Sequence, residues 1–294
     1  MTTNISQLCS VEELKPVLDS QNICVIDASW YMPAQNVDCF AQFQAERIKG
    51  AQFFDIDQVC DISSTLPHML PSTSQFSESV TNMGVNNETA IVVYDSAGLF
   101  SAARVWWMFK VFGHKNIRVL NGGLPAWIAS GGETESGGET RTKEPQSNKH
   151  RLEIYKANIN ETFLANKDVL IRNCQSGEYM VLDARSKGRF SGAQPEPRAG
   201  LPSGHMPHSK SLPFDLLVDD GYLKPESSLR SVFAEYGLDA KIDQQALITS
   251  CGSGITAAII SLALVEAGFA MHKLYDGAWS EWASSDDTVV LQGE

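Results

Sequence analysis

The chain has little of three things: long apolar runs, cysteine and positive charge. Its longest apolar stretch, around Ile255 to Val265, falls well short of the roughly 20 residues that a helix needs to cross a bilayer. The N-terminal segment, MTTNISQLCS, includes no basic side chain and no apolar run, so we expect neither a secretion signal nor a transit peptide. These absences predict a cytoplasmic protein without membrane association.

The cysteines are few and irregularly spaced. They are Cys9, Cys24, Cys39, Cys60, Cys174 and Cys251. None belongs to a C-x-x-C pair, which disfavours a zinc ribbon or a thioredoxin-type site, and we expect reduced thiols. The 23 basic residues stand against 35 acidic ones, a formal net charge of −12, which argues against nucleic-acid binding through bulk charge. An anionic substrate would therefore need a local cluster of arginines.

The 294 residues contain an internal repeat, which divides them into two domains. ICVIDASW and YMVLDARS place Asp27 and Asp183 156 residues apart, and the later segments place Ser96 and Cys251 155 apart. NGGLPAW and YDGAWSEW keep the same spacing. We predict a first domain over residues 1–140, a linker to about 150 within the Gly- and Glu-rich stretch 131–150, and a second domain over 151–294.

Each half alternates strand-like and helix-like segments. ICVID, AIVVY and IRVL in the first half, and MVLDA, ALITS and HKLYD in the second, are short runs typical of strands. Residues 101–112 and 254–267 have helical character. This alternation predicts an α/β fold with a mainly parallel sheet flanked by helices in each half. Ligands then bind beyond the C-terminal ends of the strands.

The segment ALITSCGSGITAAIISLAL carries the clearest chemical pattern. An apolar strand ends just before Cys251, and Gly252 and Gly254 follow before a predicted helix. Glycines let the backbone curl so that several N–H groups point inward, and a helix N-terminus adds partial positive charge. We expect Cys251 to act there as a thiolate.

Three interpretations of Cys251 compete. It could be a small buried core residue, as free cysteines often are. It could be the nucleophile of a cysteine phosphatase, but that chemistry needs an arginine in a C-x5-R pattern, and Ala257 stands at that position. The third is sulfur transfer, in which inward N–H groups hold a persulfide anion, and this loop supplies them.

Several motifs resemble those of the tandem rhodanese family. CGSGITA, beginning at Cys251, is similar to the active-site loop of its 3-mercaptopyruvate sulfurtransferases, and YDGAWSEW to the C-terminal signature. RVWWMFKVFGH and VLNGGLPAW resemble the inactive first domain. Thiosulfate-specific relatives carry basic residues, in the form CRKGVTA, where this chain has Gly252 and Ser253.

The resemblance implies an enzyme that moves sulfur from 3-mercaptopyruvate to a thiophilic acceptor through a Cys251 persulfide and releases pyruvate. The acceptor would be thioredoxin, a small thiol or cyanide, and no metal or organic cofactor is required. Two alternatives stay open: a thiosulfate:cyanide sulfurtransferase, and a non-catalytic rhodanese-like binding module.

The resemblance also implies roles for individual residues. Arg189 and Arg198, in GRF and PEPR contexts, would hold the substrate carboxylate and carbonyl, for which the planar guanidinium is suited. Ser253, His68 and Asp57 would form a set beside the nucleophile, with His68 reaching across the domain interface. The persulfide would be held by the loop: Gly252, Ser253, Gly254, Ile255 and Thr256.

Other polar residues are predicted to be structural. Asp183 would cap a loop at a strand end, Arg185 would pair with a carboxylate, and His205 would shape a loop. The alignment of Ser96 with Cys251 implies that the first domain is inactive, because serine cannot carry a persulfide.

Overall fold

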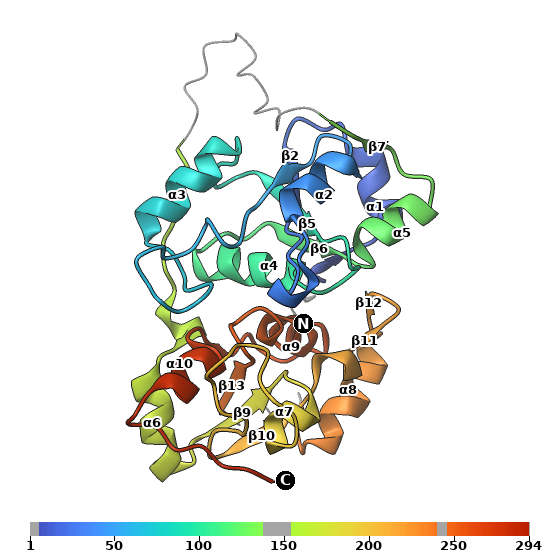
Figure 1. Cartoon of the computed structure of the whole chain (residues 1–294). Helices are drawn as coiled ribbons and strands as arrows, with labels where there is room; N and C mark the ends of the chain where they lie inside the picture. Colours follow the sequence, from blue (N-terminus) through green and yellow to red (C-terminus); the bar gives the residue numbers. More distant parts are fainter. Residues whose placement is uncertain (1–5, 138–153, 240–245, 294) are drawn as a thin grey trace.

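The computed structural model describes residues 6–137, 154–239 and 246–293, and it shows two α/β domains stacked on one another (Figure 1). Each contains a five-stranded sheet whose neighbouring strands are all parallel. The strand orders are β1-β6-β5-β2-β4 and β10-β9-β13-β14-β8. The predicted α/β class with parallel sheets is confirmed.

The first domain is built from residues up to 137. Its sheet strands are β1 (Leu8–Cys9), β2 (Ile23–Asp27), β4 (Gln52–Phe53), β5 (Ala90–Tyr94) and β6 (Ile117–Leu120). Its helices are α1 (Val11–Leu14), η1 (Lys15–Val17), η2 (Pro33–Gln35), α2 (Cys39–Ala45), α3 (Thr73–Asn82), α4 (Ala102–Val111) and α5 (Gly123–Ala129). A separate two-stranded ladder joins β3 (Arg47–Ile48) to β7 (Thr134–Glu135).

The second domain follows the same plan. Its sheet strands are β8 (Leu164–Ala165), β9 (Tyr179–Asp183), β10 (Ser209–Ser211), β13 (Ala246–Ser250) and β14 (Lys273–Tyr275). Its helices are η3 (Glu161–Phe163), α6 (Lys167–Ser176), α7 (Lys187–Ser191), η4 (Phe214–Leu216), α8 (Glu226–Glu235), α9 (Ala257–Glu266) and α10 (Ala278–Ser284). A hairpin of β11 (Val218–Asp219) and β12 (Tyr222–Leu223) stands outside the sheet.

The central strands end level with one another in both domains. Asp27 of β2 pairs with Tyr94 of β5, and Asp183 of β9 pairs with Ser250 of β13. These strands are rich in β-branched and aliphatic residues and are covered on both faces, as parallel strands are. The loops after β5 and β13 therefore leave their sheets at equivalent places.

One predicted helix boundary was wrong. The helix expected over 254–267 begins only at Ala257, because Gly254 has φ +80°, a left-handed conformation that does not continue a right-handed helix. Thr134–Glu135, inside the predicted first domain, forms β7 and pairs with β3. The predicted linker, up to about residue 150, lies outside the described residues. The domain limits themselves stay a prediction.

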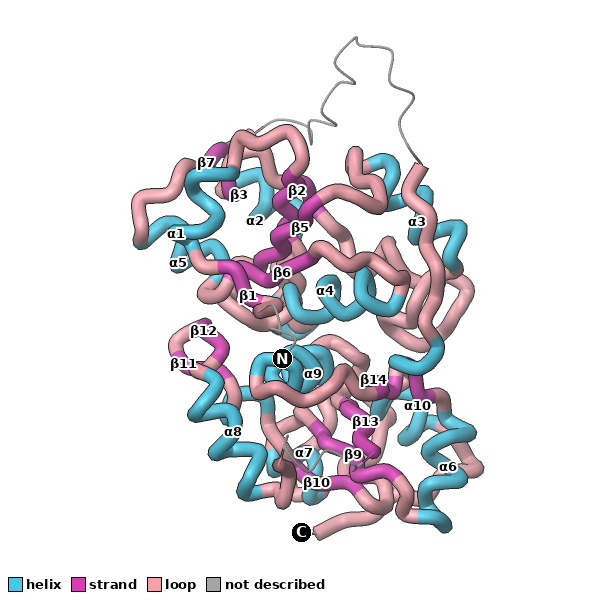
Figure 2. The backbone as a smooth tube through the Cα atoms, turned by 180° about the vertical axis from the view of Figure 1, so that it is seen from behind, coloured by secondary structure: helices cyan, strands magenta, loops and turns pink. Residues whose placement is uncertain are grey.

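The interface between the domains is formed by α4 against α9 (Figures 1 and 2). Both helices are buried on almost every side. One continuous hydrophobic cluster includes Val105 and Phe109 from the first domain and Ile259 and Leu262 from the second. Because burial of apolar area is the main stabilising term in folding, this shared core holds the two domains in a fixed relation.

Residues 155–160 pack against the first domain. Tyr155 is fully buried among Phe76 and Phe109 of the first domain, and the N–H groups of Asn158 and Asn160 donate to carbonyls at the end of α4. No helix in the described ranges has the length and apolar character to span a membrane. The six cysteines, all within those ranges, form no disulfide.

Candidate active site

Cys251 opens the loop between β13 and α9, and its side chain is buried. The first two carbonyl groups of this loop point towards α10. The Cys251 oxygen accepts a hydrogen bond from the N–H of Trp279 at 2.9 Å, and the Gly252 oxygen accepts from the N–H and the hydroxyl of Ser280 at 3.0 and 2.7 Å. The YDGAWSEW motif therefore holds the loop from behind.

The next two carbonyl groups are held by the first domain. The Ser253 oxygen lies 3.2 Å from Nδ1 of His68, and the Gly254 oxygen lies 3.4 Å from a terminal nitrogen of Arg104. Four consecutive carbonyls are thus anchored outside the loop. In the described part of the chain, the N–H groups of residues 252–256 donate to no acceptor. The loop consequently presents a set of free donors, as the glycine pattern predicted.

The other predicted loop residues fit this arrangement. Ile255 is buried, and Thr256 precedes the first residue of α9 without a side-chain capping bond. A Cβ atom on Gly254 would lie 2.9 Å from the Arg104 guanidinium, at a backbone conformation that side chains rarely adopt. Glycine at 254 is therefore required twice over, by backbone conformation and by the approach of Arg104.

The predicted Ser253–His68–Asp57 set is present, but with a different connection. Nε2 of His68 lies 3.0 Å from an Asp57 carboxylate oxygen, and Nδ1 faces the backbone oxygen of Ser253. The Ser253 hydroxyl was expected to join this set, and it does not, because the carbonyl takes that place. His68 reaches across the interface, as predicted, with a left-handed backbone (φ +62°). Its contacts make it a positioning residue for the loop.

Asp57 is fixed from two sides. Besides His68, the indole N–H of Trp30 donates to its carboxylate at 3.1 Å, and the Trp30 and His68 rings meet edge to face. The hydrogen bond from His68 lowers the pKa of the Asp57 carboxyl group. The charge of His68, the hydrogen bond from Trp30 and the charge of Arg198 act in the same direction, and together these effects outweigh burial, which raises the pKa. Asp57 therefore stays a carboxylate where it faces His68 and Arg198.

A buried ion pair between the domains was missed by the sequence analysis. Arg104, fully buried at the start of α4, contacts an Asp276 carboxylate oxygen at 2.7 Å and also donates to the His68 carbonyl. The other Asp276 oxygen accepts from the N–H of Leu70 at 2.7 Å. Arg104 lies in the RVWW segment and Asp276 in the YDGAW segment. The only sign of this pair in the sequence is the opposite charge of the two side chains.

Arg189 lies against the loop but already has a carboxylate partner. A Cβ atom on Gly252 would lie 2.9 Å from its guanidinium, which places Arg189 over the loop. The same guanidinium is paired with Glu196 at 2.6 Å. Because Glu196 is also held by Arg185 at 2.8 Å, it fixes the orientation of Arg189. Arg189 can still present its remaining N–H donors to a substrate.

Arg198 is the cation best placed to receive an anion. It is half-buried, and within the described residues it has no hydrogen bond or ion pair. Burial lowers the pKa of the Arg198 guanidinium, whereas its attraction to Cys251 acts in the opposite direction. One cavity, of about 650 Å³, is lined by Arg198, Asp57 and His68. Trp30 and other residues between 31 and 39 also form part of its wall. This cavity is large enough for a small organic substrate.

The residues predicted to be structural are so. Arg185 is fully buried, binds both Asp183 oxygens and Glu196, and stacks over Trp279 at 4.0 Å. Nδ1 of His205 lies 3.0 Å from the Phe190 carbonyl oxygen, to which it donates, and the His205 ring stacks on the Phe190 ring. In the described residues, no group of three or more His, Cys, Asp or Glu side chains could hold a metal ion.

The equivalent loop of the first domain corrects one alignment. The Tyr94 carbonyl accepts from the N–H of Ala28, as the Ser250 carbonyl accepts from Ala184. The next carbonyl, that of Asp95, accepts from the N–H of Leu124, as that of Cys251 accepts from Trp279. The counterpart of Cys251 is therefore Asp95, and not Ser96.

A difference in loop length explains the misalignment. Residues 95–101 separate β5 from α4, and residues 251–256 separate β13 from α9, so the first loop is one residue longer. Ser96 instead hydrogen-bonds to Ser29, through its N–H at 2.9 Å and its hydroxyl at 2.7 Å. The expectation that the first loop carries no persulfide is unchanged, because neither residue there is a cysteine.

Comparison with known proteins agrees with this geometry. The model of the rhodanese-like domain matches residues 10–130 and 166–285. Thiosulfate/3-mercaptopyruvate sulfurtransferase 1, mitochondrial, from Arabidopsis thaliana is 38% identical over 96% of this chain and 77% of its own length. Thiosulfate sulfurtransferase from Rattus norvegicus is 40% identical over 92% of this chain and 89% of its own.

A solved structure extends the likeness to three dimensions. SseA from Escherichia coli, described as a 3-mercaptopyruvate sulfotransferase with the rhodanese fold, superposes with a TM-score of 0.80 at 32% identity. The match covers 94% of this chain and all of that one. The family model matches twice, and the relatives align over nearly the whole chain. This chain therefore belongs to the rhodanese family, as a protein with two rhodanese-like domains.

Proposed function

We propose that this protein is a 3-mercaptopyruvate sulfurtransferase, with Cys251 as the sulfur carrier. The observation that carries the proposal is the loop around Cys251. Its carbonyls at 251–254 are anchored outside, and its N–H groups at 252–256 are left without acceptors among the described residues. A ring of free N–H donors stabilises an anion, and a persulfide on Cys251 would be that anion.

The donor binds through the arginines. The carboxylate of 3-mercaptopyruvate pairs with Arg198, which has no other partner in the described residues, and Arg189, which lies against Gly252, contributes further donors. The Cys251 thiolate then attacks the sulfur of the donor. The Sγ–S bond forms, the C–S bond breaks, and its electron pair passes to the enolate of pyruvate, which takes up a proton at carbon.

The second half-reaction regenerates the thiolate. A thiophilic acceptor, such as a small thiol, thioredoxin or cyanide, attacks the outer sulfur, and the bond to Cys251 breaks with its electron pair returning to Sγ. The Ser253 hydroxyl makes no hydrogen bond within the described residues, and Ser253 is a buried residue two positions after Cys251. It supports the developing enolate or delivers the proton. His68 and Asp57 act by holding the Ser253 carbonyl.

Thiosulfate is the second candidate donor, and relatives named for each donor match this chain at similar identity. The local charge favours 3-mercaptopyruvate, because the positions that are basic in the thiosulfate-specific loop are Gly252 and Ser253 here. A dianion would gain less from such a neutral loop.

A paired steady-state assay tests the proposal, with 3-mercaptopyruvate and thiosulfate as donors and cyanide as the common acceptor. We expect a higher kcat/KM for 3-mercaptopyruvate and no turnover of either donor by Cys251→Ser, which keeps the size of the side chain. A preference for thiosulfate would overturn the donor assignment and keep the persulfide. Turnover by Cys251→Ser would overturn the mechanism itself.

A further inference from the structure

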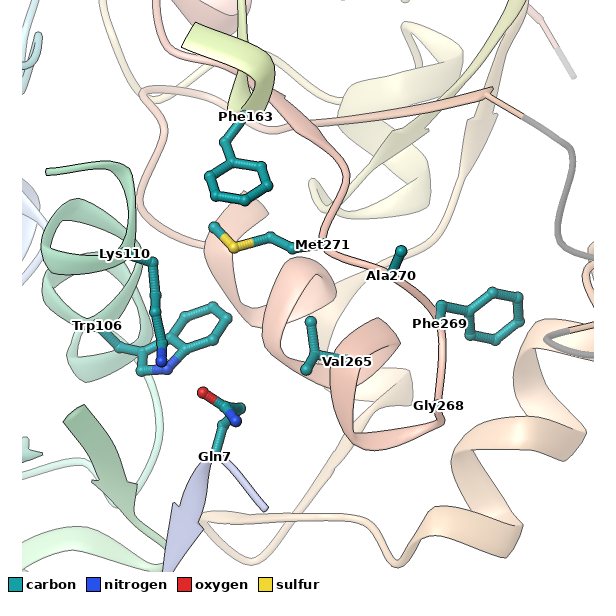
Figure 3. A pocket seen from close by; sticks show the side chains of 9 residues that line it. All are labelled: Gln7, Trp106, Lys110, Phe163, Val265, Gly268, Phe269, Ala270 and Met271. Carbon is teal, nitrogen blue, oxygen red and sulfur yellow. The ribbon is translucent and has the colours of Figure 1, made fainter. Parts of the chain in front are cut away.

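A second cavity, of about 380 Å³, lies at the other end of the interface between the domains (Figure 3). It lies where α4 and α9 end, whereas the Cys251 loop lies where α9 begins. Val265 is eight residues beyond Ala257, a distance of about 12 Å along a helix. Four segments meet there: the chain before β1, α4, η3 and the turn after α9. The cavity is therefore separate from the proposed active site.

The walls of this cavity are mostly apolar. Figure 3 shows Phe163 and Met271 on one side, Val265 below them and the Trp106 ring opposite. These side chains leave room for a small apolar body. No acidic residue is among the lining residues, although the protein as a whole is strongly acidic.

Lys110 is the charged group of the cavity. Its ammonium group donates to the Lys115 carbonyl at 3.0 Å, and among the described residues it is paired with no carboxylate. Burial alone lowers the pKa of Lys110, to about 8. The nearby Glu266 carboxylate is engaged elsewhere, by the N–H of Gln7 and the hydroxyl of Ser6. The positive charge in the cavity is thus not neutralised.

Trp106 adds a second donor on the same helix face. It lies one turn before Lys110, at the i, i+4 spacing that brings side chains together on a helix. Its side chain is almost completely buried, and its indole N–H has no acceptor in the described residues. A buried donor without an acceptor is costly, so an oxygen atom arriving from the cavity would gain from meeting it.

We propose that this cavity binds a small organic anion made of an apolar body and one carboxylate group. The body packs against Phe163, Val265 and Met271, and the carboxylate faces the Lys110 ammonium and the Trp106 N–H. The 3-mercaptopyruvate molecule does not fit this description, because it lacks an apolar body. The site is therefore a binding site additional to the catalytic one and does not depend on the reaction there.

Isothermal titration calorimetry of the full chain with phenylacetate tests this site, and phenylacetamide serves as the uncharged probe of the same shape. We expect one phenylacetate per chain, with binding at least about tenfold weaker for phenylacetamide, which loses the charged contact. Cys251→Ser should bind phenylacetate as the original chain does, since the catalytic thiol is remote. Absence of saturable phenylacetate binding would overturn the proposal.

Substitutions of the lining residues test whether phenylacetate binds in this cavity. Lys110→Met keeps the apolar stem and should weaken phenylacetate binding about tenfold, whereas Lys115→Met, at an exposed lysine that does not line the cavity, should leave it unchanged. Trp106→Phe keeps an aromatic wall and should weaken binding by a smaller factor. If Lys110→Met does not fold, Lys110→Gln replaces it. Equal affinity of the folded Lys110 variant and the original chain would contradict the assignment, as would displacement of phenylacetate by pyruvate.

Discussion

The loops after β5 and β13 leave equivalent sheets, yet their interiors are filled differently. In the first, the Asp95 carboxylate turns into the loop and accepts hydrogen bonds from four N–H groups, at distances from 2.8 to 3.0 Å. The donors are those of Ala97, Phe100, Ser101 and Ala102. In the second loop Cys251 stands in the place of Asp95, and the N–H groups of residues 252–256 have no acceptor among the described residues.

This comparison shows what the loop is built to hold. Both loops form a ring of N–H donors, and in the first domain a carboxylate of the same chain occupies that ring permanently. The second loop replaces this carboxylate with a side chain that can acquire and release an anionic sulfur. The first domain thus displays, with its own aspartate, the kind of ligand that the second would hold during catalysis.

The two loops also differ in what stabilises them. The first is held from inside, by the Asp95 carboxylate, in addition to the outer hydrogen bond from the Leu124 N–H. The second is held from outside, by α10, His68 and Arg104. An empty ring of donors has no internal partner, so its shape depends on docking of the first domain. The first domain therefore contributes to the Cys251 loop, because it supplies the His68 and Arg104 side chains that hold it.

The largest expected effect comes from breaking the external support. Arg104→Met leaves Asp276 buried without its cation and should reduce the free energy of unfolding by about 3–5 kcal/mol, with loss of turnover. Urea denaturation and steady-state kinetics measure the two effects. The control is Arg230→Met, which breaks an exposed pair with Glu226 and should cost less than about 0.5 kcal/mol. Equal effects of the two substitutions would contradict the role of Arg104.

Removal of the internal support should cost less and spare catalysis. Asp95→Asn keeps the shape of the side chain but loses the charge that the four N–H groups face. We expect a loss of about 2–3 kcal/mol in the free energy of unfolding and an unchanged kcat for 3-mercaptopyruvate. The exposed Asp286→Asn is the matched control. A large fall in kcat without a fall in stability would show that the first loop takes part in the reaction.

Arg198 tests the anion site beside the second loop. Arg198→Ala should raise the KM for 3-mercaptopyruvate by roughly 10- to 100-fold, the equivalent of about 1.5–3 kcal/mol for a charged hydrogen bond, and change kcat less. Arg189→Ala should have a smaller effect on KM, because Glu196 already shares its charge. Initial-rate measurements over a range of donor concentrations separate KM from kcat. An unchanged KM for Arg198→Ala would remove Arg198 from the site.

The smallest effect concerns pH. The folded protein lowers the pKa of Asp57, so this carboxylate contributes stability above its unfolded pKa of about 3.9, and the contribution is lost as pH falls through the lower folded value. The difference in unfolding free energy between the original chain and Asp57→Asn should stay below about 1 kcal/mol at pH 7, since the side chain is half-exposed. Denaturation at pH 7 and near pH 3 should show that difference shrinking in acid. A difference that grows in acid would contradict the assignment.

The sequence predicts most of the fold and the centre of the site. The strands around Asp27 and Ser250 are short β-branched runs, and their local pattern is sufficient to identify them. Cys251 is marked by its place between a strand and a glycine-rich turn. These features are local, and each is encoded within a few neighbouring residues.

What the sequence did not predict depends on contacts between distant segments. The pairing of Arg104 with Asp276 exists only when the two domains dock, and no local pattern of either motif encodes it. The Asp95 alignment failed because one additional residue in a loop of small side chains shifts the register without changing its composition. His68 meets the Ser253 carbonyl, and not its hydroxyl, because of the path of the backbone, which residue type alone does not determine.

The most direct test of the account is the mass of the peptide that contains Cys251, measured after incubation of the protein with 3-mercaptopyruvate and no acceptor. We predict that this peptide becomes one sulfur atom heavier, that cyanide reverses the change, and that peptides containing the other five cysteines keep their mass. A Cys251 peptide of unchanged mass while pyruvate is released, or a sulfur atom carried on another cysteine, would contradict it.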